Sequence, residues 1–333
     1  METIYRWDLD KTYLRSDFDT LRELVRTALL TASERENIPG TAALLRELRF
    51  DPDGNVNRIF VVSGSPRQMQ RVLAEKLMLD GVTVDGLELK PNLENLLRGR
   101  FRALRDQLGY KLPILLETRL ALPDVTAPEI CFGDDAEMDV VIYRLFGELC
   151  AGTVDGPLLD AILAAARLYP DQNARIRSAV ARLPRTGIDP VRRIFINLEV
   201  GSPVARFESY GPRVVPTFNA FQAALVLQQD GHLTVAAVGR VADELLTKHD
   251  LTRRRLENAL TDAVRRGLVD AAQLEPVCTM LALPRPTVRP PVRVPERAID
   301  YVARLDELSR IHQERKLLRR PSLRELLGLG RER

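Results

Sequence analysis

The sequence Ile4-Tyr-Arg-Trp-Asp-Leu-Asp-Lys-Thr12 begins as a short apolar and aromatic run, which is followed by two carboxylates two residues apart. Its first four residues favour a β-strand, which places Asp8 and Asp10 just beyond the carboxyl end of that strand. There, one carboxylate can contact a phosphorus atom while the other transfers a proton. An isolated acidic pair is also typical of a turn, so its meaning depends on the segments that follow.

Strands and helices alternate outward from this stretch through the first 150 residues. Arg58 to Val62 and Glu129 to Phe132 are β-rich runs that predict buried strands, and Val82 to Leu89 predicts a strand or hairpin. Apolar residues at helical spacing predict helices over residues 19–30, 41–48, 68–79 and 112–122. This alternation predicts an α/β fold of the Rossmann-like kind, a parallel sheet with helices on both faces, whose ligands bind beyond the carboxyl ends of the strands.

The pattern changes after residue 152, where helical spacing dominates and one β-rich run, residues 193–198, interrupts it. We therefore expect three parts: a sheet domain over residues 1–152, a mostly α-helical accessory domain over 153–283, and a proline-rich linker with a basic C-terminal helix over 284–333. Residues 195–222 are rich in aromatic side chains, which indicates packing against the sheet domain, with a lid over the site as the open alternative.

The composition indicates a globular protein outside the membrane-spanning and nucleic-acid-binding classes. The chain has no signal pattern and no apolar run near the roughly 20 residues that span a bilayer. Its three cysteines, widely spaced, fit a reducing compartment, so we expect a cytoplasmic protein with contact at a membrane periphery as an open alternative. From Pro284 onward, thirteen Lys/Arg against seven Asp/Glu give +6, whereas the whole chain is +3. The basic character thus belongs to the tail, and no nucleic-acid partner is expected.

Further polar residues follow the other predicted strands or begin a predicted helix. Ser63 follows one strand, with Gly64 and Ser65 placed to offer backbone N–H groups to an anion at a helix start. Lys111 begins a helix after Gly109-Tyr110, and Lys90 is the alternative for its place. The last predicted strand is followed by three carboxylates, those of Asp134, Asp135 and Asp139.

Convergence of these groups at one edge of the sheet would make a phosphoryl-transfer site. Five carboxylates in one crevice repel each other, and Mg²⁺, which prefers a few carboxylate oxygens together with water and phosphate, relieves that repulsion. A bound phosphoryl group also needs an ammonium and hydroxyl donors, which Lys111 and Ser63 supply. The set is consistent with phosphoryl transfer through an aspartyl-phosphate.

The four segments that carry these polar groups, around Asp8, Ser63, Lys111 and Asp134, resemble in this order the four motifs of the haloacid dehalogenase-like (HAD-like) phosphohydrolase superfamily. The similarity is closest to the catalytic domain of actin-patch phosphatidate phosphatases, and it covers roughly residues 1–150 through segments 7–12, 38–48, 60–66, 110–111 and 132–143. Lys11 stands where related sequences usually carry an acidic residue, and Asp135 stands where they carry Ser. These differences bear on the substrate more than on the chemistry.

The resemblance implies a role for each matched residue. Asp8 would be the nucleophile and a metal ligand, Asp10 the general acid and then base with its carbonyl on the metal, and Asp134 a direct metal ligand. Phosphate binding would fall to Thr12, which would also steady the loop, and to Ser63, Gly64 and Lys111. Asp139, with Asp135 beside it, would orient metal-bound water or Lys111.

The function implied is that of a Mg²⁺-dependent phosphatase, phosphatidate phosphatase-like by its closest branch. Two alternatives stay open: a phosphatase for a small soluble phosphate ester or a phosphoprotein, and an inert scaffold that keeps the fold for binding. The expected partner is a phosphorylated small molecule or a lipid head group. The basic tail favours docking on the protein itself or on a protein partner, with a membrane surface as the other possibility.

Overall fold

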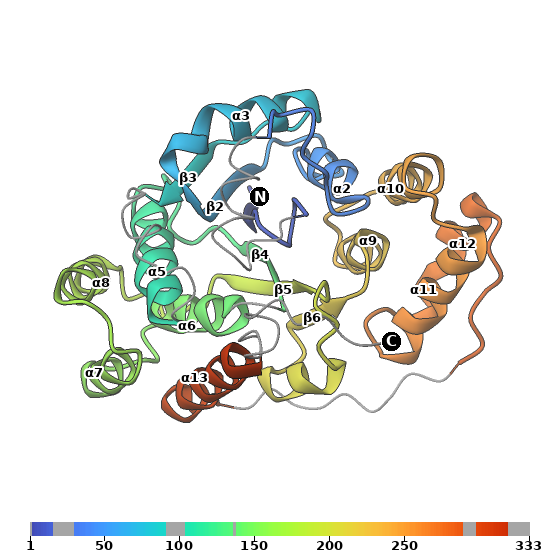
Figure 1. The fold of residues 1–333 in the computed structure, drawn as a ribbon. Helices are drawn as coiled ribbons and strands as arrows, with labels where there is room; N and C mark the ends of the chain where they lie inside the picture. The colour runs from blue at the N-terminus through green and yellow to red at the C-terminus, as the bar shows by residue number, and fades with distance from the viewer. Residues whose placement is uncertain (1, 16–29, 91–103, 136–137, 289–297, 319–333) are drawn as a thin grey trace, which may run out of the picture.

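The computed structural model describes residues 2–15, 30–90, 104–135, 138–288 and 298–318, with side chains described except at 104–106 and 312–318. At its centre lies one six-stranded sheet in the order β3-β2-β1-β4-β5-β6, and every neighbouring pair is parallel (Figure 1). The strands are β1 (Ile4–Asp8), β2 (Arg58–Pro66), β3 (Gly86–Lys90), β4 (Glu129–Asp134), β5 (Val191–Asn197) and β6 (Val214–Thr217). The predicted parallel α/β fold is confirmed.

Helices cover both faces of this sheet (Figure 1). The core on one face includes α2 (Thr41–Glu47), α3 (Gln70–Leu79), α9 (Ala220–Gln229), α10 (Val235–Lys248), α11 (Arg253–Arg265) and α12 (Glu275–Leu281). The other core includes α5 (Leu104–Leu120), α6 (Asp139–Ala151), α7 (Gly156–Ala165), α8 (Pro170–Arg182) and α13 (Tyr301–Leu318). Successive residues of a strand alternate between the cores, as Phe132 and Phe195 do against Cys131 and Ile194. The helix predicted over residues 19–30 lies almost wholly outside the described residues.

The strands β5 and β6 extend the sheet with residues from the second half of the chain. Three aromatic rings stack across neighbouring strands, Trp7 on Phe132 at 4.0 Å and Phe132 on Phe195 at 4.9 Å between centroids. The aromatic-rich segment therefore does pack against the first strands, but as part of the same sheet. The predicted boundary between residues 152 and 153 falls between β4 and β5, and the division into domains stays a prediction.

A buried ion network fixes β1 against β4 and α5. The Arg6 guanidinium donates to Glu129 Oε2 at 2.8 Å, Arg119 donates to Glu129 Oε1 at 2.8 Å, and Arg6 also donates to the Thr118 hydroxyl at 2.5 Å. The side chains of both arginines and of Glu129 are at most 4% exposed. The network holds together the three elements that carry Asp8, Lys111 and Asp134.

The C-terminal helix α13 packs on the second core, where it contacts α5 and α7. Tyr301, Leu305 and Leu308 are buried there, and the Arg304 guanidinium lies 4.8 Å from the Tyr210 ring centroid. The described part of the tail thus docks on the protein, while the residues from 319 onward lie outside the description. In the described residues, no helix has both the length and the apolar character required for a membrane span.

Candidate active site

Three carboxylates meet at the carboxyl edge of the sheet. Asp8 is the last residue of β1, Asp134 is the last residue of β4, and Asp139 is the first residue of α6, which follows β4 after a short loop. Each offers an oxygen atom within 4.8 Å of the other two, and all three side chains are buried. β1 and β4 are neighbours in the sheet, so the parallel order brings together acids that are more than 120 residues apart in sequence.

Lys111 reaches this acidic cluster from α5. Its Nζ lies 2.9 Å from Asp8 Oδ1 and 2.5 Å from Asp139 Oδ1, and its side chain is 2% exposed. The prediction that Lys111 opens a helix is wrong, because α5 begins at Leu104. Gly109 instead permits close packing of α8, since a Cβ at this position would come within 2.3 Å of Gln172. Lys90, the alternative, is the last residue of β3 at the edge of the sheet.

Asp10 is held by two serine hydroxyl groups from β2. Ser63 Oγ and Ser65 Oγ each donate to Asp10 Oδ2 at 3.0 Å, and the Ser65 N–H donates to Ser63 Oγ at 2.9 Å. The prediction that a helix starts directly after Ser63 is wrong: β2 continues to Pro66, a 3₁₀ turn follows, and α3 begins only at Gln70. Anion binding by this segment stays a prediction. Gly64 accordingly lies in the strand and is exposed.

The loop after β1 turns sharply between the two acids. Lys11 has φ of 60°, a left-handed conformation that is uncommon for a residue with a side chain. Thr12 Oγ1 lies 3.5 Å from Asp8 Oδ2, in a position to donate to the carboxylate of Asp8. Thr12 therefore lies against Asp8, the nucleophile that the resemblance implies. A contact of this kind is needed if Thr12 is to steady the loop, as expected from the sequence.

Asp135 contacts a different part of the chain from the one predicted. Its Oδ1 accepts from the Val200 N–H at 2.9 Å and its Oδ2 accepts from the Ser202 N–H at 2.7 Å. Both carboxylate oxygens are thus used to fix the loop after β5. Asp139, not Asp135, makes the contact with Lys111. A role of Asp135 toward metal-bound water stays a prediction.

The charges of the cluster favour a divalent cation. Three carboxylates give −3 and the Lys111 ammonium gives +1, which leaves these four buried groups at −2. Mg²⁺ binds in proteins through one or two carboxylates together with phosphate and water oxygens, so the donor set fits this ion.

The neighbouring tyrosines do not compete as acids. Burial, and then the negative charge of Asp139, raises the pKa of Tyr143 well above its usual value, and its hydroxyl donates to Phe132 O at 3.0 Å. Burial, and then the charge of Glu88, raises the pKa of Tyr110 likewise. Both phenols therefore stay protonated at neutral pH.

Three features around the loop after β1 (residues 9–15) were not predicted from the sequence: the contact of the Ser65 hydroxyl with Asp10, and the places of Arg35 and Asn197. Ser65 shares one side of β2 with Ser63, and strand alternation could have predicted this. Arg35 is buried; burial lowers the pKa of its guanidinium, and the nearby Asp10 charge opposes that shift. Asn197, at the end of β5, gave no local signal, because its role depends on the strand next to it.

Residues 7–156 match the family model described as phosphatidate phosphatase APP1, catalytic domain. The match confirms the family resemblance of this segment. The APP1-like segment contains all four clustered residues and ends before β5. No curated protein and no solved structure gave a match.

Proposed function

We propose that this chain is a Mg²⁺-dependent phosphatase that hydrolyses phosphate monoesters through an aspartyl-phosphate on Asp8. The observation that supports it most strongly is the buried meeting of Asp8, Asp134 and Asp139 with Lys111 at the carboxyl edge of a parallel sheet. The family described as phosphatidate phosphatase supplies the first candidate substrate.

Asp8 and Asp134 would hold the Mg²⁺ ion, with Asp139 beside them. The bound ion would neutralise the carboxylates and the negative charge of the phosphoryl group. The same charge balance explains how three acids can be buried together, since an isolated ionised carboxylate is costly to bury.

The chain's own residues account for the proton and bond changes. The Asp8 carboxylate attacks phosphorus and the ester oxygen leaves with a proton from Asp10; water, deprotonated by Asp10, then attacks the aspartyl-phosphate and releases phosphate. Lys111 would stabilise the charge on the phosphoryl oxygens. Ser63 and Ser65 would hold the Asp10 carboxylate in place for both proton transfers.

Release of phosphate from p-nitrophenyl phosphate tests the reaction. We expect activity with Mg²⁺, its loss with EDTA, and a fall of kcat by roughly 10⁴-fold or more in Asp8→Asn. Asp53→Asn, the same substitution at an exposed turn, is the matched control and should keep full activity. Equal activity in Asp8→Asn would exclude Asp8 as the nucleophile, and no activity in the wild type under any divalent metal would favour the inert scaffold.

A substrate panel separates the remaining alternatives. We expect phosphatidate in mixed vesicles to give the highest kcat/KM among phosphatidate, sugar phosphates, nucleotides and phosphopeptides. A preference for a soluble ester or a phosphopeptide would keep the reaction and replace the lipid substrate.

A further inference from the structure

Asn197 connects the two loops that carry the catalytic acids. Its side-chain Nδ2 donates to the backbone carbonyl of Lys11 at 2.9 Å, in the loop after β1. Its own backbone carbonyl accepts from the Asp135 N–H at 3.1 Å, in the loop after β4. One residue at the end of β5 is therefore bonded to the loop that follows Asp8 and to the loop that follows Asp134.

The Lys11 backbone needs such a contact because its conformation is unfavourable. With φ of 60°, the Cβ of this residue crowds its own backbone, a strain that glycine would not have. Lys11 stands between Asp10 and Thr12, so its φ and ψ decide where those two side chains point. Inside the loop the Lys11 N–H donates to Leu14 O at 2.8 Å, and Asn197 binds the carbonyl on the other side of the residue.

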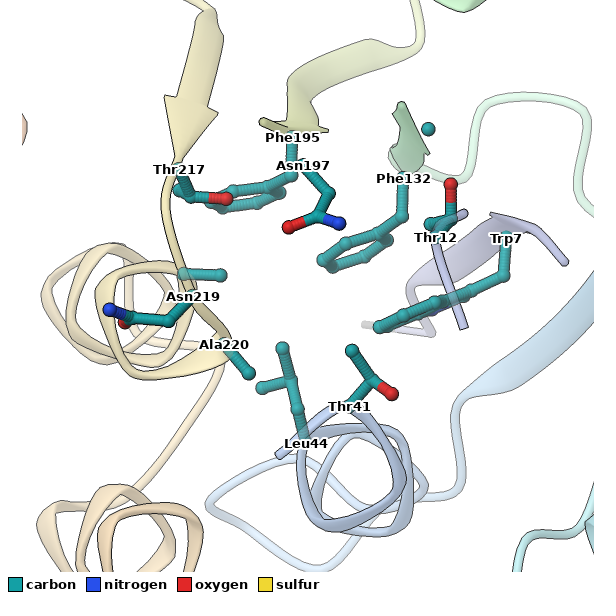
Figure 2. A pocket seen from close by; sticks show the side chains of 12 residues that line it. Trp7, Thr12, Thr41, Leu44, Phe132, Phe195, Asn197, Thr217, Asn219 and Ala220 are labelled. Carbon is teal, nitrogen blue, oxygen red and sulfur yellow. The ribbon is translucent and has the colours of Figure 1, made fainter. Parts of the chain in front are cut away.

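Asn197 is itself held in place. The carboxylate of Asp135 binds the N–H groups of Val200 and Ser202, which ties the loop after β5 back to β4. In the view of Figure 2, the Asn197 amide lies between Phe195 and Phe132, and Thr12 lies on the far side of Phe132; these residues line a small cavity. That cavity has a volume of about 20 Å³, enough for roughly one water molecule, so the amide has little space in which to turn away.

We propose that Asn197 is a positioning residue of the active site. It holds the loop after β1 (residues 9–15, the catalytic loop) in its left-handed turn and fixes the position of this loop relative to the loop after β4. The proposal rests on the phosphatase function above, since Asn197 touches no reacting group and acts through the backbone of Lys11. It also extends the active site beyond the APP1-like segment, which ends at residue 156.

Two substitutions and their combination test the proposal through kcat and KM for p-nitrophenyl phosphate. Asn197→Ala should lower kcat by about 10- to 100-fold and change KM by less than about threefold, because the acids shift while the binding groups remain. Addition of Lys11→Gly to Asn197→Ala should bring the kcat of this double variant to within about fivefold of the wild-type kcat, because glycine adopts φ of 60° without strain.

Asn219→Ala is the matched control. Asn219 lies two residues after β6, at the N-cap of α9, and lines the same cavity. Its substitution removes the hydrogen bond from the Gln222 N–H, and no contact with the catalytic loop is lost. It should lower the melting temperature and leave kcat unchanged.

Hydrogen exchange of the peptide that covers residues 9–15 gives a second readout that needs no turnover. We expect faster exchange by about tenfold or more in Asn197→Ala and no change in Asn219→Ala. Three outcomes would each overturn the proposal. The first is that Asn197→Ala keeps the kcat and the exchange rate of the wild type. The others are that both asparagine variants lose kcat equally, or that Lys11→Gly does not restore kcat. If the wild type hydrolyses nothing, the exchange result still decides the role of Asn197, while the proposed function fails on its own.

Discussion

At the scale of single residues, the site depends on the absence of a side chain at Gly133. A Cβ at this position would lie 2.4 Å from Asp139 Oδ2 and 2.5 Å from Asp139 Cβ, closer than non-bonded atoms approach. In Gly133→Ala, Asp139 would have to shift, and with it the carboxylate that contacts Lys111. We expect a fall of kcat by about 10²-fold or more, because small displacements of catalytic groups have effects of this size.

Gly156→Ala is the control for this substitution, since its added Cβ meets no atom within 4 Å and its backbone does not require glycine. It should keep wild-type kcat for p-nitrophenyl phosphate. Unchanged activity in Gly133→Ala would mean that the contact between Asp139 and Lys111 is dispensable for the reaction.

At the scale of elements, the Glu129 carboxylate holds β1, β4 and α5 together through two buried arginines. Glu129→Gln removes the charge and leaves both guanidinium groups buried beside a neutral amide. We expect the free energy of unfolding to fall by about 3–5 kcal/mol, measured by urea denaturation. Glu117→Gln breaks an exposed pair with Arg175 and should cost less than about 1 kcal/mol; equal losses in the two variants would contradict the argument.

At the same scale, α2 and α10 are joined by an ionisable side chain, that of Glu244. Glu244 accepts from the Ala43 N–H at 3.1 Å and from Arg46 at 2.5 Å. Burial alone would raise the pKa of Glu244, but the hydrogen bond and charge of Arg46 outweigh it and lower that pKa below its usual 4.5. Because the folded state favours the ionised form, the stabilisation is complete above about pH 4.5 and is lost as the pH falls through the lowered pKa.

We therefore expect Glu244→Gln to lower the free energy of unfolding by about 1.5–3 kcal/mol at pH 7 and by progressively less below pH 4.5. Urea titrations at several pH values between 3 and 7 measure this difference. A difference that stays constant over this range would show that the charge of Glu244 does not contribute.

At the scale of the whole molecule, the sequence predicts the parts whose signal is local and misses those that depend on distant neighbours. The alternation of strands and helices predicts the parallel sheet, and acids after the strands predict where Asp8 and Asp134 meet. β6 escapes prediction because four residues before a helix carry too little periodicity. The actual contacts of Asp135 and Asn197 lie between loops of different strands, and no spacing within one segment encodes them.

The C-terminal helix α13 completes the second core from the far end of the chain (Figure 1). Leu305 is buried in that core, while the adjacent Asp306 is exposed. Leu305→Ala should lower the free energy of unfolding by about 2–5 kcal/mol through the cavity it leaves, and Asp306→Ala by less than about 0.5 kcal/mol.

Both variants should keep wild-type kcat at a temperature where they are folded, because the acidic cluster found among the described residues contains none from α13. Equal stability of the two variants in thermal denaturation would mean that α13 does not remain docked in solution, and the basic tail would then be free for a membrane or protein partner.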